Sequence, residues 1–242
     1  MITRRRAVKL IGATTASVCL PIGSSRILAA EGSPLRRAIP STGEKLPVIG
    51  LGSAVTFDVP FNSPKVADIT EVITRFVKRG GKVIDTSPSY GNAESLIGQI
   101  AGKSGLTDSL FIATKVRARG REAGIAQIEQ SLGRFQRRKI DLIQVHNLVD
   151  VDAQMSALRE SKSKGTIRYT GITYSEPQGF AEIERNMKSQ HPDFVQINYS
   201  IVDRGAAQRI LPLAQELRMR KPSRWPRCDF HTNGIFCSAA KG

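Results

Sequence analysis

Four ionisable side chains of types that can hold or move a proton lie in or just beyond short apolar runs. They are Asp85, Tyr90, Lys115 and His146. A carboxylate beside a lysine keeps that lysine charged, and a charged lysine beside a phenol helps the phenol to give up its proton. Such a group suits protonation of a carbonyl oxygen while a hydride arrives from elsewhere. Each residue alone also fits a structural role, such as a helix cap, a packing ring or a solvated charge.

The elements that would position these side chains alternate along the chain between residues 46 and 217. The apolar runs are Pro47–Gly52, Lys82–Thr86, Leu110–Val116, Asp141–Val145, Thr166–Ile172 and Asp193–Tyr199. Runs that are apolar almost throughout predict strands buried on both faces, and the amphipathic segments between them predict crossover helices. The first predicted helix has Ser63 as its N-cap, Pro64 in its first turn and Gly80 after its end.

Repeated strand–helix units of this length are typical of two α/β folds, an open doubly wound sheet and a (β/α)8 TIM barrel. A dinucleotide-binding doubly wound domain carries Gly-x-Gly-x-x-Gly after its first strand, whereas Gly50-Leu51-Gly52 lacks the third glycine. We therefore predict an incomplete barrel with about six of the eight strand–helix units. Reactive side chains of such barrels lie at the carboxyl ends of the strands, which is where the four candidates fall.

Several of these segments together resemble the aldo-keto reductase family. They are the stretch Gly81–Gly98, which is similar to the family signature, and the strand segments Leu46–Gly52, Ile140–His146 and Gly165–Thr173. The resemblance covers roughly residues 38 to 217 and implies a barrel of the aldo-keto reductase type. It implies that Tyr90 is the general acid, that Lys115 and Asp85 tune it, and that His146 orients the carbonyl group.

The resemblance also implies a cofactor and a substrate class. NADP would be the hydride carrier, no metal would be needed, and the substrate would be a small aldehyde, ketone or alcohol. Gln196 matches the glutamine that holds the nicotinamide carboxamide, and Thr173 stands where a serine is usual. Gly52 and Ser53, at the end of the first strand, are expected to be further cofactor contacts. Two other functions stay open, a non-catalytic NADP-binding barrel or regulatory subunit, and a metal- or phosphate-dependent barrel hydrolase or lyase.

Residues 1–30 differ in composition from residues 31–217 and are predicted to be a twin-arginine signal peptide. The stretch Thr3-Arg4-Arg5-Arg6-Ala7-Val8-Lys9 resembles the twin-arginine consensus, and the apolar run that follows it ends in Leu28-Ala29-Ala30, which suits cleavage. That run is too short and too rich in small polar residues for a permanent membrane anchor. We therefore expect export by the twin-arginine machinery to the periplasm, with a cytoplasmic enzyme as the alternative.

Residues 218–242 also differ in composition from residues 31–217. The stretch Arg218–Arg227 is half basic, and no apolar alternation that would indicate a strand follows it up to Gly242. We expect a disordered basic tail after a partial barrel of residues 31–217, produced by truncation or by a frame shift near codon 218. Without the segments that grip the NADP phosphates, such a chain is expected to have little or no activity.

The net charge of +15 does not indicate nucleic-acid binding. Residues 1–30 hold five basic residues and no acidic one, and residues 218–242 hold six basic residues and one aspartate. Most of the excess charge therefore lies in the two end segments, whereas a nucleic-acid interface needs a basic stripe on one folded face.

Overall fold

The computed structural model describes residues 34–217 and 235–238. The predicted signal peptide of residues 1–30 lies outside the described residues, as do residues 218–234 and 239–242 of the predicted tail. Among the helices of the described ranges, none combines the length and the apolar character that crossing a membrane requires.

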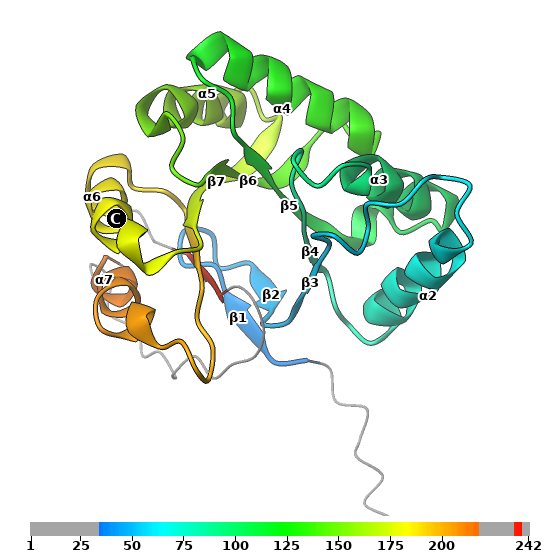
Figure 1. Ribbon diagram of the computed structural model, residues 1–242, viewed down its shortest axis with the longest axis horizontal. Coiled ribbons are helices and arrows are strands. Elements are labelled where there is room, and N and C mark those ends of the chain that lie inside the picture. Colours follow the sequence, from blue (N-terminus) through cyan, green and yellow to red (C-terminus); the bar gives the residue numbers. More distant parts are fainter. Residues whose placement is uncertain (1–33, 218–234, 239–242) are drawn as a thin grey trace, which may run out of the picture. The chain divides into compact units, whose positions relative to one another are not determined.

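Six parallel strands form a curled sheet in which each strand pairs with the next one along the chain (Figure 1). The strands are β3 (Gly50–Gly52), β4 (Val83–Asp85), β5 (Phe111–Val116), β6 (Ile140–His146), β7 (Ile167–Tyr174) and β8 (Phe194–Ile197). The helices that follow them are α2 (Lys65–Lys78), α3 (Ala93–Lys103), α4 (Arg121–Phe135), α5 (Val151–Ser163), α6 (Phe180–Gln190) and α7 (Ile210–Glu216). The predicted alternation of parallel strands and crossover helices is confirmed.

The start of α2 shows how the sequence sets one helix boundary. The backbone N–H of Lys65 donates to the Ser63 hydroxyl at 3.3 Å, and the N–H of Val66 donates to the Ser63 carbonyl at 3.0 Å. Gly80 follows the helix with a φ of 85°, which a glycine adopts without strain. Gly80 therefore follows the end of the helix as predicted, whereas the prediction of Ser63 as the N-cap is wrong. Pro64 already has a helical backbone conformation and is itself the N-cap, and the regular turns begin at Lys65.

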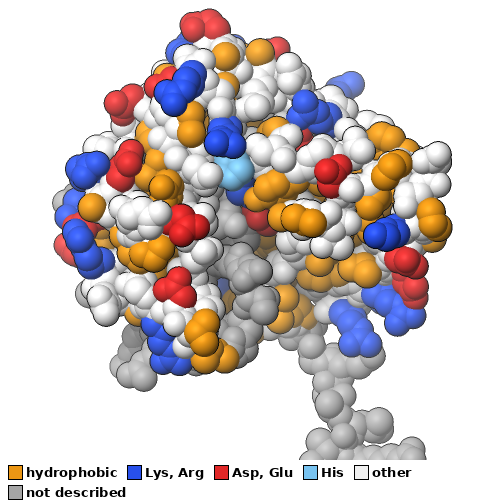
Figure 2. Space-filling model, viewed as in Figure 1, with side chains coloured by type: hydrophobic (Ala, Val, Ile, Leu, Met, Phe, Trp, Pro, Cys, Tyr) orange, Lys and Arg blue, Asp and Glu red, His pale blue; other side chains and the backbone are white. Residues whose placement is uncertain are grey.

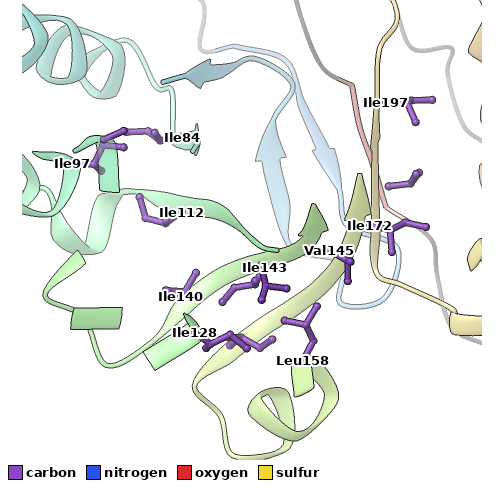
Figure 3. Packing of buried hydrophobic residues seen from close by; sticks show 14 of the residues in the cluster. Ile84, Ile97, Ile112, Ile128, Ile140, Ile143, Val145, Leu158, Ile172 and Ile197 are labelled. Carbon is purple, nitrogen blue, oxygen red and sulfur yellow. The ribbon is translucent and has the colours of Figure 1, made fainter. Parts of the chain in front are cut away.

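Strands β4 to β8 are largely buried on both faces, and the two faces pack against different partners. Outward side chains, such as Ile84 of β4, pack against helix residues such as Ile97 of α3 (Figure 3). Inward side chains of the first half of each strand form a second apolar cluster: Val83, Phe111, Ala113, Leu142, Tyr169 and Phe194. This cluster fills one end of the space that the curled sheet encloses.

An antiparallel hairpin, which the sequence reasoning missed, covers this apolar cluster. Its strands are β1 (Arg36–Ala38) and β2 (Lys45–Pro47), and Ile39 and Leu46 pack on the cluster. The predicted single strand Pro47–Gly52 is therefore wrong. Pro47 ends β2, the chain turns, and β3 begins at Gly50, because the N–H of Val48 donates at 2.8 Å to Leu35 before β1 and not to the parallel sheet.

The described part of the tail differs from the prediction. Residues 235–238 form β9 (Ile235–Ser238), which pairs antiparallel with β8 in the register Val195 to Cys237. The physical reason is that β8 would otherwise leave one row of backbone N–H and C=O groups unpaired at the edge of the sheet. Four residues without a clear apolar alternation are enough to satisfy that edge.

Candidate active site

The alternation of side chains along each strand places the candidate residues on the inner face. Val83, Phe111 and Leu142 belong to the inner apolar cluster. Asp85, Lys115 and His146 follow them on the same strands by two, four and four residues. An even spacing along a strand places two side chains on the same face, so the three candidates also point inward. The parallel register then sets Asp85 opposite Ala113 and His146 opposite Thr173. The same strands therefore carry an apolar floor at one end and polar groups at the other.

Asp85 and Lys115 form an ion pair between β4 and β5. Lys115 Nζ lies 2.9 Å from Asp85 Oδ1 and donates a second hydrogen bond of 2.8 Å to the carbonyl of Thr86. The Lys115 side chain is 3% exposed and that of Asp85 is 16% exposed. A buried ammonium needs such a counter-charge, and the two bonds hold the Lys115 side chain in one position.

Tyr90 reaches the site from the turn that joins β4 to α3. Its N–H donates to the Ser87 carbonyl at 3.0 Å, and its carbonyl accepts from Ala93 N–H at 3.1 Å, so the turn leads directly into α3. Lys115 Nζ lies 5.2 Å from the centroid of the Tyr90 ring, which is within cation–π range. Among the described residues, none hydrogen-bonds the Tyr90 hydroxyl, so the phenol is available to a ligand.

His146, at the end of β6, completes the group. Its ring stands edge-on to the Tyr90 ring, with the centroids 6.2 Å apart. Burial, followed by the charges of Lys115 and Arg117, lowers the pKa of His146 from 6.5 to about 4. The imidazole is therefore neutral at physiological pH and can donate one hydrogen bond and accept another. The structure thus brings together the four residues that the sequence singled out.

Gln196 joins this group from β8 through its amide. Its Nε2 donates to Asp85 Oδ2 at 3.2 Å, and its Oε1 accepts from Gln144 Nε2 at 2.8 Å. Gln144 is fully buried on β6, and its own Oε1 has no hydrogen-bond partner among the described residues. The sequence reasoning missed Gln144. The signal was its spacing of two residues from His146, which places both side chains on one face of the strand.

The remaining predicted contacts lie around the same end of the sheet. Gly52 is in register with Asp85, and the N–H of Ser53 donates to the Asp85 carbonyl at 3.0 Å. Thr173 lies between His146 and Gln196 in the register of β6, β7 and β8. The Ser53 hydroxyl is buried without a partner among the described residues, so it has unused hydrogen-bonding capacity.

The site has no cluster of metal-ligand type. Within the described residues, no three His, Cys, Asp or Glu side chains come together in a way that could hold a metal ion.

Figure 2 shows cationic and anionic side chains interspersed over the face seen in that view, without a stripe of one sign.

Comparison with known proteins supports the assignment that the signature suggested. The model of the Aldo/keto reductase family matches residues 48–220, and the chain therefore belongs to the aldo/keto reductase family. The aldo-keto reductase YhdN of Bacillus subtilis is 27% identical over 195 residues, which are 74% of this chain and 58% of that protein. The chain thus spans less than two thirds of the length of this relative.

Solved structures give the same fold. An aldo-keto reductase of Klebsiella pneumoniae in complex with NADPH has a TM-score of 0.64 and 23% identity, covering 75% of this chain and 65% of that one. The thermostable aldo-keto reductase Tm1743, in complex with the inhibitor epalrestat, has a TM-score of 0.62 and 26% identity, covering 75% of this chain and 68% of that one. These matches support a (β/α)8 barrel architecture, of which the described residues form a curled portion of six parallel strands.

Proposed function

We propose that this chain is an NADP-dependent oxidoreductase that reduces a small aldehyde or ketone, or oxidises the corresponding alcohol. The observation that carries the proposal is the position of Lys115 Nζ, which lies 2.9 Å from Asp85 Oδ1 and 5.2 Å from the centroid of the Tyr90 ring. A buried lysine beside a phenol can stabilise the negative charge that remains on the phenol oxygen when the phenol donates its proton.

Tyr90, Lys115 and His146 would each have a different role in the proton transfer. Tyr90 would donate its hydroxyl proton to the carbonyl oxygen, and Lys115 would stabilise the negative charge left on the phenol oxygen. Neutral His146 would donate a hydrogen bond to the same carbonyl oxygen and orient it. In the reverse direction Tyr90 would take the proton of an alcohol, so one arrangement serves both reduction and oxidation.

Polar groups around the site fit the nicotinamide end of NADP, which would supply the hydride when bound. A carboxamide offers donors and acceptors, and Gln196 retains one amide hydrogen and one acceptor position beyond its bonds to Asp85 and Gln144. The Ser53 hydroxyl is buried without a partner among the described residues. Thr173 and Gly52 lie at the same end of the sheet, so these residues would hold the nicotinamide.

Replacement of the general acid tests the proposal. The 242-residue chain is expected to turn over slowly, and Tyr90→Phe should lower whatever NADPH-dependent reduction of generic aldehydes it shows by about 10²- to 10⁴-fold. The upward shift of the thermal unfolding transition by NADP should persist, because the phenol hydroxyl is not one of the proposed cofactor contacts.

The outcomes of this experiment separate the functions that the sequence left open. Retained turnover in Tyr90→Phe would overturn the role of Tyr90. A shift by NADP without turnover on a broad carbonyl panel would indicate a non-catalytic NADP-binding barrel. Protection by inorganic phosphate or a divalent metal, with no effect of NADP, would instead indicate a hydrolase or lyase.

We also propose that residues 1–30 direct export of the folded chain by the twin-arginine machinery to the periplasm. The support is the Arg4-Arg5 pair, the short apolar run and the small residues that end it. Fusion of residues 1–35 to a reporter should export it, and replacing Arg4 and Arg5 by Lys should abolish export. Equal reporter localisation in both fusions would favour a cytoplasmic enzyme.

A further inference from the structure

Ser87 is a buried polar residue beside the site that the proposed mechanism does not use. It lies two residues after Asp85 and is fully buried. Its Oγ lies 3.2 Å from Nδ1 of His146 and accepts a hydrogen bond of 3.2 Å from the N–H of Ser89. These two contacts are the ones that the Ser87 side chain makes within the described part of the chain.

The two contacts decide which way the hydrogen bond to His146 runs. If Nδ1 of His146 carried the imidazole proton, Ser87 Oγ would accept from both Nδ1 and Ser89 N–H. Its own hydroxyl proton would then have no acceptor among the described residues, in a place that water does not reach. If Nδ1 is unprotonated, it accepts the Ser87 proton and all three groups are satisfied.

We infer that Ser87 is a positioning residue, which donates its hydroxyl proton to Nδ1 of His146 and thereby fixes the imidazole with its N–H on Nε2. Nε2 makes no hydrogen bond to any described residue, so this N–H is free for a ligand. The inference rests on the proposed function for its purpose, since a carbonyl oxygen needs a donor and not an acceptor. The depressed pKa of His146 agrees with a neutral ring that has two possible tautomers.

The tautomer can be measured without any turnover. In the full chain with ¹⁵N-labelled histidine, the His146 ring signals are identified by their loss in His146→Gln. At pH 7 we expect an unprotonated Nδ1 and a protonated Nε2 in the wild-type chain. In Ser87→Ala we expect the two tautomers to become mixed, and in Ser87→Thr, which keeps the hydroxyl, we expect the wild-type signals.

Kinetics give the second readout. Ser87→Ala should lower kcat about twofold with little change in the KM for NADPH, because only a fraction of the molecules would present a donor to the carbonyl. Ser161→Ala is the matched control, because Ser161 is a buried serine on α5 outside the site. It should change neither the His146 signals nor kcat. Thermal transitions of all variants check that they fold.

Several results would overturn the inference. A protonated Nδ1 in the wild-type chain would do so without any variant, as would an unchanged tautomer in Ser87→Ala. Turnover that Tyr90→Phe leaves unchanged would count against the proposed function, whereas the tautomer measurement would still decide the role of Ser87. The failures of the two proposals are therefore distinguishable.

Discussion

The two carboxylate oxygens of Asp85 accept hydrogen bonds from different strands. Oδ1 accepts from Lys115 on β5, and Oδ2 accepts from Gln196 on β8. The position of the Lys115 ammonium and the orientation of the Gln196 amide therefore both depend on one acidic residue. Asp85 thus links the groups proposed to tune the proton donor with those proposed to hold the cofactor.

Removing Lys115 tests how much the ion pair matters. Lys115→Met should lower the free energy of unfolding by about 3 kcal/mol at pH 7, because it leaves the partly buried Asp85 carboxylate without its counter-charge. Urea unfolding measures the loss. The double variant Lys115→Met, Asp85→Asn should recover part of it, since no unpaired charge remains.

A surface ion pair provides the control for this prediction. Lys188 Nζ lies 2.9 Å from Glu184 on α6, and the Lys188 side chain is 56% exposed. Lys188→Met should therefore cost less than about 1 kcal/mol. Similar losses for Lys188→Met and Lys115→Met would contradict the importance of burial for the Asp85–Lys115 pair.

The environment of His146 predicts a pH dependence of stability. Its folded pKa is depressed to about 4 from 6.5, so between these values the unfolded chain binds a proton that the folded chain does not. The free energy of unfolding should therefore fall as pH drops from about 6.5 to about 4, and His146→Gln should lack this component. Urea unfolding at pH 7, 6 and 5 measures it.

The matched variant for this test is His191→Gln, which removes an exposed imidazole outside the site. It should keep the wild-type decline in stability between pH 7 and 5. If wild type and His146→Gln declined in parallel, the buried and electropositive surroundings assigned to His146 would be incorrect.

At the scale of single residues, the sequence predicted the groups with distinctive chemistry and missed those with common chemistry. Asp85, Tyr90, Lys115 and His146 were found because ionisable residues at the ends of apolar runs are unusual. Gln144 and Ser87 are neutral, and their importance depends on contacts across the sheet that spacing along one strand does not show.

Close packing between helices α3 and α4 leads to a prediction at the scale of elements. A Cβ on Gly98 of α3 would lie 2.4 Å from the carbonyl oxygen of Arg134 and 2.7 Å from Cα of Phe135. These are backbone atoms that cannot rotate away. Gly98→Ala should therefore lower the free energy of unfolding by about 2 kcal/mol, measured by urea unfolding.

Gly133, in α4, is the matched control within the same pair of helices. A Cβ there would meet no atom within 4 Å, and the residue lies inside a helix. Gly133→Ala should raise the free energy of unfolding by about 0.5–1 kcal/mol, because alanine loses less backbone freedom on folding. The prediction for Gly98 would be wrong if both substitutions stabilised the chain.

Elements were predictable from sequence where the apolar pattern was long enough. The strands β5, β6 and β7 have six to eight residues and were located within one or two residues of their ends. The hairpin strands β1 and β2 have three residues each, which is too few to show an alternation. Their position is set by contacts with the inner apolar cluster, which exists only after the sheet has formed.

At the scale of the whole molecule, the described sheet runs from β3 to β9 without pairing of these two end strands. The edge of β8 is covered by β9. Deleting residues 235–242 should therefore expose that edge, and light scattering should show more soluble aggregate at a given protein concentration.

Deletion of residues 239–242 alone is the control for this prediction, because it leaves all of β9 in place. It should scatter light like the full chain. Equal aggregation of the two deletion variants would show that the pairing of β9 with β8 does not protect the edge in solution.

Gly171 on β7 faces Gln144 across the β6–β7 ladder. A Cβ at position 171 would lie 2.7 Å from Cγ of Gln144 and 3.1 Å from the Phe194 carbonyl oxygen. The long amide therefore occupies space that a side chain at 171 would need. During divergence of this chain, residue 144 would have to shorten before residue 171 could grow. The order of these two substitutions is thus constrained, because a larger residue at 171 is disfavoured as long as Gln144 is present.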